Sequence, residues 1–310
     1  MIRDYISMAR PDHWFKNVFM LPGVILAWQE CPPQHPTGAL AVILLGVAAA
    51  CLVCSSNYTI NELVDAPEDR KHPQKKHRAA ASGRVGRGWG YFQWALLGAA
   101  GLALSWIVGL RFLLTEVALL VMGLTYNVRP VRLKERPYVD VLSESVNNPL
   151  RLLLGWYAVR CSLVPPVSLL LSYWMLGCFF MAIKRFAEMK YINNKEIAAA
   201  YRKSFAYYTP ERLLISIIFY ATAFGLFGGI FLIRYRIELI MGVPFLAGFM
   251  AMYMRLGFQP NSPVQYPEKL YKQKGLVAYT LLTAVILIAC LIMRIPHLSR
   301  LLEPTIPKHF

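Results

Sequence analysis

Residues 57–73 read NYTINELVDAPEDRKHP, and this stretch closes a long apolar run with acidic residues that basic residues then follow. Asn61, Asp65 and Asp69 lie four residues apart, so on a helix their side chains share one face. Oxygen ligands of this kind suit a Mg²⁺ ion that carries a diphosphate. Pro67 lies inside the set, and we expect it to end or kink the helix near Asp65, so that a loop completes the face.

A second acidic stretch repeats this spacing downstream. Asp140, Glu144 and Asn148 again lie four residues apart, with the amide now at the C-terminal end. Each set lies at the mouth of an apolar segment, and two such faces predict a metal-diphosphate site between them. For either set taken alone, a solvated helix end is the alternative interpretation.

The composition is that of a polytopic membrane protein. The chain has 310 residues, of which 56% are hydrophobic and only 16% are charged, and its mean hydropathy is +0.42. Residues 1–16 are polar and amphipathic, so we expect no cleavable signal peptide. We predict one all-α domain over residues 1–310, an integral membrane bundle of about nine transmembrane helices around a central cavity that opens to the cytoplasmic side.

Apolar runs of sufficient length place the individual spans. The predicted spans are 18–30, 39–61, 91–110, 112–127, 138–158, 166–184, 213–233, 238–254 and 276–294. Only Arg111 separates the third span from the fourth, so we expect a tight turn there. Pro22, Pro149 and Pro244 lie inside predicted spans, where a proline can kink a helix.

The net charge of +16 follows the membrane pattern, not that of a nucleic-acid-binding protein. Basic residues concentrate in the N-terminal segment and in the predicted loops 62–90, 128–137 and 184–212, whereas the opposite loops hold few. By the positive-inside rule, these loops, the N-terminus and the active site face the cytoplasm. We therefore expect an integral protein of the bacterial inner (cytoplasmic) membrane, with membrane lipids and no nucleic acid among its partners.

Basic residues beside the acidic sets are suited to hold phosphate oxygens through charge-assisted hydrogen bonds. The candidates are Arg70, Lys75, Arg78, Arg132, Lys134 and Lys184, and for any one of them an orienting charge without substrate contact is the alternative. Arg151 differs because it lies about two turns into a predicted span, where charge is costly and usually functional. We expect Arg151 to pair with a carboxylate of the Asp140/Glu144 face or to contact a substrate phosphate.

Several other residues give weaker signals. Lys16 at the first span is either an orienting charge or a substrate contact, and Lys184 with Glu188 is either a plain i, i+4 pair or part of the site. Cys51 and Cys54 lack companion metal ligands, so we expect them to be packing residues.

Two further segments are expected to be loops. His72 has no metal-ligand companion and is expected to be a loop residue that is close enough to the acids to touch phosphate. The 255–275 loop is expected to be a plain connector.

Together these motifs resemble the UbiA superfamily of intramembrane prenyltransferases. The resemblance rests on Asn61-x-x-x-Asp65-x-x-x-Asp69, a basic cytoplasmic loop, Asp140-x-x-x-Glu144 and about nine spans, and it covers the chain from Arg10 to about residue 290. The family pattern usually has Asp at the position of Glu62 and often at that of Glu144. Both positions here are Glu, which keeps the carboxylate on a side chain that is one methylene longer.

Four shorter motifs are similar to those of decaprenyl-phosphate phosphoribosyltransferases, a branch that transfers 5-phosphoribosyl from its diphosphate to a polyprenyl phosphate. They are Arg10-Pro-x-x-Trp14-x-Lys16-Asn17, Asp69-Arg-x-His72-Pro73-x-Lys75-x-x-Arg78, Lys184-Arg185-x-Ala-Glu188 and Tyr208-Thr209. Prenyl transfer to an acceptor and phosphoribosyl transfer to the lipid both stay open, as do prenyl chain length, acceptor and oligomeric state.

Both interpretations imply the Mg²⁺-assisted departure of a diphosphate from its donor, with a polyprenyl lipid as the other partner. The candidate catalytic residues are Asp65, Asp69, Asp140 and Glu144, and with Asn61 they are the candidate ligands of two expected Mg²⁺ ions. The candidate substrate-binding residues are Lys16, Asn17, Asn61, Arg70, Lys75, Arg78, Tyr126, Arg132, Lys134, Asn148, Arg151, Lys184 and Glu188. A transporter or lipid flippase is the alternative, but acids gathered at one membrane face favour the enzyme.

Overall fold

The computed structural model describes residues 2–70, 75–192, 196, 202–293, 295 and 298. Those residues form helices and connecting loops, without a β-strand in the described part of the chain. The elements are α1 (Ile2–Ala9), η1 (Pro11–Met20), α2 (Leu21–Glu30), α3 (Pro36–Asp69), η2 (Lys75–His77), α4 (Arg87–Val108), α5 (Leu110–Asn127), η3 (Leu133–Glu135), α6 (Val139–Ser145), α7 (Asn147–Ala158), α8 (Val167–Ile192), η4 (Lys203–Ala206), α10 (Pro210–Tyr235), η5 (Ile237–Gly242), α11 (Val243–Phe258), η6 (Pro263–Gln265), η7 (Pro267–Lys272) and α12 (Lys274–Ile292). The all-α class is confirmed.

Seven helical segments of the described chain are long and apolar enough to cross a membrane. They are α3, α4, α5, α8, α10, the η5–α11 pair and α12. The predicted spans 18–30 and 138–158 are not continuous α-helices, because the first is divided between η1 and α2 and the second between α6 and α7. The predicted loops 62–90 and 184–212 start too early, since α3 continues to Asp69 and α8 to Ile192.

Three prolines that were expected to kink spans instead lie at helix starts. Pro22 is the second residue of α2, Pro244 is the second residue of α11, and Pro149 is the third residue of α7. Proline is tolerated there because the first-turn N–H groups have no partner inside the helix. Val146 separates α6 from α7, but it keeps helical φ and ψ angles, and its N–H still donates to the carbonyl of Leu142 at 3.2 Å.

Pro67 does not end α3 near Asp65. The helix runs through it to Asp69, and the N–H of Arg70 still donates to the carbonyl of Ala66 at 3.2 Å. Packing holds these last turns, because Leu63 and Ala66 are buried in a cluster with Met8, Ala79, Ala80 and Val85. Asn61, Asp65 and Asp69 therefore lie on one continuous helix, as the spacing predicted.

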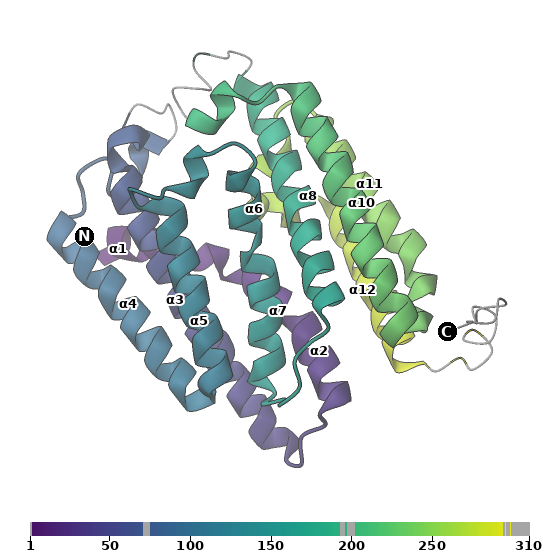
Figure 1. Ribbon diagram of the computed structural model, residues 1–310. Coiled ribbons are helices and arrows are strands. Elements are labelled where there is room, and N and C mark those ends of the chain that lie inside the picture. Colours follow the sequence, from purple (N-terminus) through teal and green to yellow (C-terminus); the bar gives the residue numbers. More distant parts are fainter. Residues whose placement is uncertain are drawn as a thin grey trace.

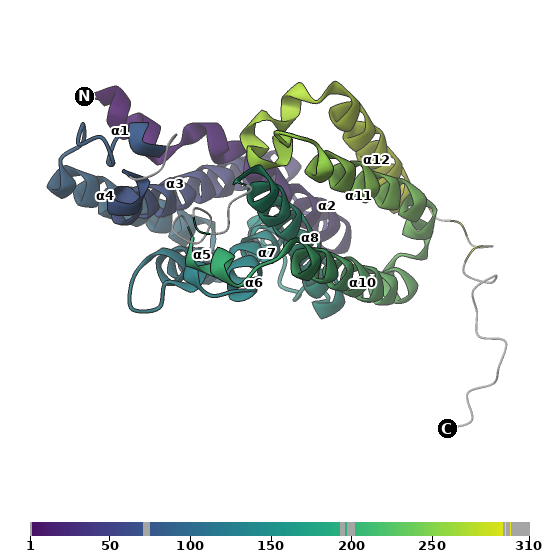
Figure 2. The same cartoon turned by 90° about the horizontal axis from the view of Figure 1, so that it is seen from above.

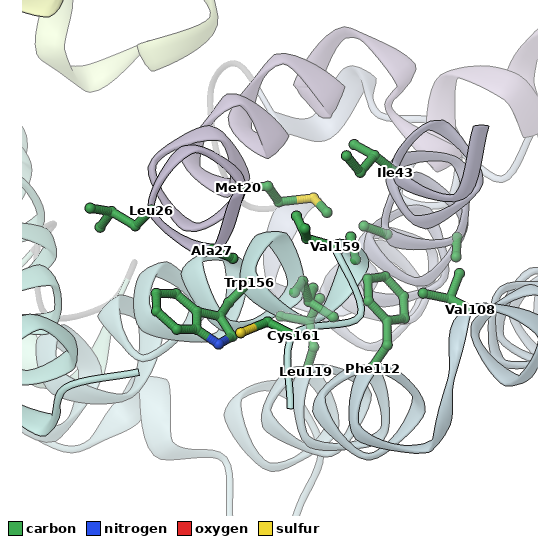
Figure 3. Close-up of a cluster of buried hydrophobic side chains, with 14 of the residues drawn as sticks. Met20, Leu26, Ala27, Ile43, Val108, Phe112, Leu119, Trp156, Val159 and Cys161 are labelled. Atoms are coloured by element: carbon green, nitrogen blue, oxygen red, sulfur yellow. The ribbon is translucent and has the colours of Figure 1, made fainter. Parts of the chain in front are cut away.

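The bundle has two halves (Figures 1 and 2). Its buried apolar side chains form two main clusters, the first of which includes residues of both halves. In the first, Ile43 of α3 and Phe112 of α5 are buried in one cluster with Trp156 and Val159 at the end of α7 (Figure 3). The second core forms around α8, which packs against α10 and α11. Viewed along the helices, α3, α4 and α5 lie on one side and α10, α11 and α12 on the other (Figure 2).

The backbone of α7 crosses the η1–α2 segment in direct contact. A Cβ atom at Gly155 would lie 1.9 Å from the carbonyl oxygen of Met20, and one at Gly23 would lie 2.1 Å from that of Leu152. Only glycine permits so close an approach, and small residues serve this purpose in membrane bundles. The crossing fixes the N-terminal segment against α7.

A disulfide that the sequence did not predict joins Cys31, just after α2, to Cys161, just after α7. Their Cα atoms are 5.5 Å apart although 130 residues separate them in the chain. The α4–α5 turn lies at the same end, because the guanidinium of Arg160 donates to the carbonyls of Ile107 and Val108 at 3.1 Å. That turn consists of Gly109 alone, with φ +152°, which confirms the expected tight connection.

Gly155→Ala is expected to lower the melting temperature of the detergent-solubilised protein, because the new methyl group must force α7 away from Met20. Gly229→Ala is the matched control, since Gly229 lies inside α10 with no atom within 4 Å of its would-be Cβ. There the substitution should be neutral or stabilising by up to about 1 kcal/mol. Equal melting temperatures for both variants would contradict the close crossing.

Candidate active site

A cavity of about 880 Å³ lies between the two halves of the bundle. Its walls come from η1, α3, α5, α6 and α7 of the first half and from α8, α11, η7 and α12 of the second. The structure brings seven of the predicted site residues to this cavity: Lys16, Asn61, Tyr126, Glu144, Asn148, Arg151 and Lys184. The other predicted site residues do not line this cavity.

The cavity face of α3 begins one turn earlier than the sequence indicated. Asn57 lines the cavity with Asn61, and its position four residues before Asn61 was a signal that could have identified it. The amide of Asn57 donates to the carbonyl of Leu119 at 3.0 Å, while its Oδ1 is buried without a hydrogen-bond partner. Gly123 of α5 makes room for this side chain, because a Cβ there would lie 2.1 Å from that Oδ1.

The carboxylates at the end of α3 are neutralised by the basic loops. Asp65 forms ion pairs with Lys134 and, at 3.2 Å, with Arg132. Asp69 pairs with Arg78 at 2.7 Å. These contacts confirm that the loops around residues 78 and 132 lie against the first acidic set. They also show that the bases hold carboxylates here, whereas phosphate was expected.

Two further predicted loop residues lie nearby. Arg70 uses its Nε to donate to the carbonyl of Ala81 at 3.0 Å. Residues 71–74, which include His72, lie outside the described residues, so its expected phosphate contact is not placed.

The second acidic set divides between two environments. Glu144 lines the cavity, but Asp140 is fully buried and is not part of the cavity wall. Arg185 donates to Asp140 at 3.1 Å and the hydroxyl of Tyr208 donates at 2.5 Å. Burial raises the pKa of Tyr208, next to the Asp140 charge, so its hydroxyl stays a donor. Asp140 thus ties α6 to α8 and to the loop before α10.

Glu188 belongs to the same buried network and does not line the cavity. Its carboxylate accepts a hydrogen bond from Arg185 at 2.8 Å, three residues earlier on α8. Arg185 therefore joins Asp140 to Glu188, while its neighbour Lys184 faces the cavity.

Arg151 forms no ion pair with a carboxylate of the described residues, contrary to one of the two expectations for it. Its Nε donates to Asn17 Oδ1 at 3.2 Å, and its Nη2 lies 3.6 Å from Cys54 Sγ. The amide of Asn17 in turn donates to Cys51 Sγ at 3.2 Å. The two cysteines were expected only to pack. Instead, Cys54 contacts this buried guanidinium, and Cys51 accepts a hydrogen bond from the asparagine beside it.

Among the described residues, the cavity wall carries four cations, of which Lys269 lies 4.9 Å from the centroid of the Tyr266 ring. The other three are Lys16, Arg151 and Lys184, and none of these forms an ion pair with any described carboxylate. The Lys16 ammonium lies over the ring of Tyr58, 5.6 Å from its centroid. Glu144 likewise has no ion pair within the described chain. Unpaired charge between apolar helices is costly, so this arrangement favours an anionic ligand.

The rest of the wall is mainly apolar and includes a segment that the sequence did not identify. Phe19, Phe180, Phe249 and Leu281 line the cavity, so it can hold hydrocarbon beside the charged groups. The prediction that 255–275 is a plain connector is wrong, because η7 contributes Glu268 and Lys269 to the cavity wall. Its sequence shows no periodic pattern that would have signalled this.

The donor types fit a Mg²⁺ ion that arrives with phosphate. Asn61 donates its amide to Asn127 at 2.6 Å, which leaves its Oδ1 to act as a ligand in line with Asp65 and Asp69. The described residues contain no group of three or more His, Cys, Asp or Glu close enough to hold a metal. Mg²⁺ needs no such cage, because one or two carboxylates with substrate phosphates and water usually bind it.

The profile of the UbiA prenyltransferase family matches residues 17–266. Decaprenyl-phosphate phosphoribosyltransferase of Mycobacterium tuberculosis is 28% identical over 213 residues, 69% of this chain and 68% of the relative. The protein of the same name from Corynebacterium glutamicum is 30% identical over 214 residues, 67% of this chain and 60% of its own. The structure of a UbiA homolog from Archaeoglobus fulgidus, bound to GPP and Mg²⁺, covers 93% of this chain and 97% of its own, with a TM-score of 0.70 and 18% identity.

Affinity for inorganic diphosphate should depend on pH through Lys75, at the start of η2. Burial, with help from Arg78, lowers the pKa of Lys75 from its usual 10.5 to about 8. Raising the pH from about 7 to 9 therefore removes this charge and should weaken binding by about tenfold, as for the loss of one charge-assisted hydrogen bond. Calorimetric titration of the solubilised protein measures this change.

Lys75→Arg should flatten this dependence, because a guanidinium keeps its charge at pH 9. Lys76→Arg, at an exposed neighbouring position, should keep the wild-type profile. If the wild type and Lys75→Arg lose affinity equally, Lys75 does not bind diphosphate.

Proposed function

This chain belongs to the UbiA prenyltransferase family, and from that premise we propose that it transfers 5-phosphoribosyl from its diphosphate to a polyprenyl phosphate. The observation that carries the proposal is the set of cations Lys16, Arg151 and Lys184, which form no ion pair within the described chain and lie in a cavity whose wall is otherwise mainly apolar. A lipid with a phosphate head group supplies both chemistries, because its head neutralises the cations and its chain fills the apolar part.

The relatives support the phosphoribosyl branch over a purely prenyl-transferring one. Proteins named decaprenyl-phosphate phosphoribosyltransferase match this chain over about two thirds of its length. Two of the four branch motifs also reach the cavity, because Lys16 and Lys184 line it and Asn17 orients Arg151. In this assignment the lipid is the acceptor, and its phosphate lies near Arg151.

The diphosphate of the donor binds at the end of α3. Asn61, Asp65 and Asp69 would hold Mg²⁺ there, with Glu144 across the cavity as a further oxygen donor. Bound Mg²⁺ neutralises the charge that develops on the departing diphosphate. Lys134 and Arg78 contact the same carboxylates, so they are placed to exchange carboxylate for phosphate oxygens when the donor arrives.

The chemical step joins two anions and therefore depends on cations. An oxygen of the lipid phosphate forms a bond to C1 of the ribose, while the bond from C1 to the diphosphate oxygen breaks and the diphosphate leaves with the electron pair. Arg151 and Lys16 offset the repulsion between the acceptor phosphate and the donor. The apolar wall excludes water, which would otherwise attack C1 and hydrolyse the donor.

We propose that the acidic end of α3 faces the cytoplasm of a bacterial cell and that the disulfide faces the outside. The basic loops that contact Asp65 and Asp69 belong on the inner side by the positive-inside rule. The Cys31–Cys161 disulfide lies where α2 and α7 end, far along these helices from the acidic motifs, and disulfides persist in oxidising compartments.

Purified protein in detergent should add one phosphoribosyl unit to a polyprenyl phosphate when Mg²⁺ and phosphoribosyl diphosphate are present. The mass of the lipid product measures this. Asp65→Asn and Glu144→Gln should lower turnover by about two orders of magnitude or more, since each removes charge that organises the diphosphate site. Glu211→Gln, at an exposed position of α10, is the matched control.

Two results would decide against this function. One is consumption of a prenyl diphosphate with no phosphoribosylated lipid, which would assign the chain to prenyl transfer. The other is near-normal turnover in both carboxylate variants.

The orientation can be measured by cysteine labelling of intact cells. After mild reduction, a membrane-impermeant maleimide should label the partly exposed Cys31 from outside, whereas buried Cys161 and Cys178 should stay unlabelled. A cysteine introduced at exposed Lys76 should react only after the cells are opened. Labelling of the position-76 cysteine in intact cells would reverse the proposed orientation.

A further inference from the structure

A second cavity, of about 550 Å³, lies outside the one described above. The residues that line it are Arg129, Pro130, Val131, Arg132, Glu135, Arg136 and Lys203. It shares no lining residue with the larger cavity. It is formed by the loop between α5 and α6, together with the first residue of η4.

The charge of this cavity is not balanced within it. Four of its side chains are cationic and one is anionic. Glu135 is already shared by Arg132 at 2.6 Å and Lys203 at 3.0 Å. Arg136 is exposed and has no ion pair or side-chain hydrogen bond within the described chain. The nearest acid to Arg129 is Glu68, at 3.9 Å.

One wall of the cavity is rigid. Arg132 is only 6% exposed, and its guanidinium is held by Asp65 at 3.2 Å and Glu68 at 3.4 Å on the side that faces α3. Its Nε side contacts Glu135 inside the second cavity. A buried guanidinium fixed in this way provides a preorganised anchor, to which the exposed Arg129 and Arg136 add mobile charges.

The position and shape of the cavity point to a phosphate group. The loop begins directly after α5 ends at Asn127, which puts it where a membrane-spanning helix leaves the bilayer. Pro130 and Val131 are exposed beside the arginines. Arginine forks bind phosphate oxygens in pairs, and basic pockets at the ends of spanning helices bind anionic lipid head groups.

We propose that this pocket binds a phosphate group at a site separate from the transferase cavity. Its ligand is a phosphate ester that pairs with Arg136 and Arg129 while Arg132 keeps its contacts with Asp65. An anionic phospholipid head group and a soluble phosphate both carry this chemistry. The site is assigned from its own residues and does not depend on which group the larger cavity transfers.

The test uses the full chain in nanodiscs of phosphatidylcholine, with two probes. Phosphatidylglycerol is mixed into the discs and its retention is measured by native mass spectrometry, and inorganic phosphate is titrated by calorimetry. Arg136→Gln is the principal variant, because it removes a charge without breaking a contact within the described chain. Lys203→Gln is the second variant, and Arg87→Gln, exposed at the start of α4, is the matched control.

Arg136→Gln and Lys203→Gln should each weaken binding of at least one probe by about tenfold, while Arg87→Gln keeps wild-type affinity. Loss of phosphatidylglycerol retention identifies a lipid head group, and loss of phosphate binding identifies a soluble ligand. The proposal is overturned if neither probe binds the wild type, or if Arg136→Gln binds both as the wild type does. Melting temperatures of all variants establish that they remain folded.

Discussion

The structure depends on the neutralisation of acidic side chains along the last turns of α3. Each is held by a base from a different segment: Glu62 by Arg10, Asp65 by Lys134 and Asp69 by Arg78. Since buried carboxylates need partners, these pairs draw the N-terminal segment and two loops onto one helix end. The same pairs gather basic side chains of three separate segments at this end of α3.

The larger cavity has the opposite electrostatic character. Its acids are few, and its cations Lys16, Arg151 and Lys184 are unpaired within the described chain. Their positive charge lies between two separate apolar cores, one around α3, α5 and α7 and one around α8. The end of α3 is therefore a cluster of ion pairs, whereas these three cavity cations form none within the described chain.

Glycine sets the geometry between these parts. Gly155 and Gly23 let α7 touch the η1–α2 segment, and this contact presents Asn17 to the guanidinium of Arg151. Gly123 likewise leaves room for Asn57 on the cavity face of α3. Backbone contacts of this kind depend on which helices cross, so the polar contacts of the cavity depend on the tertiary packing of otherwise featureless apolar segments.

The sequence by itself determined the all-α membrane class, the family, and the alignment of Asn61, Asp65 and Asp69, because hydropathy and helical spacing are local properties. Only the tertiary structure decided which acids face the cavity. Asp140 turned inward to Arg185 and Tyr208, whereas Glu144 on the same short helix lines the cavity. The Cys31–Cys161 disulfide and the role of η7 also come from contacts between residues distant in the chain, and residue spacing carries no information about such contacts.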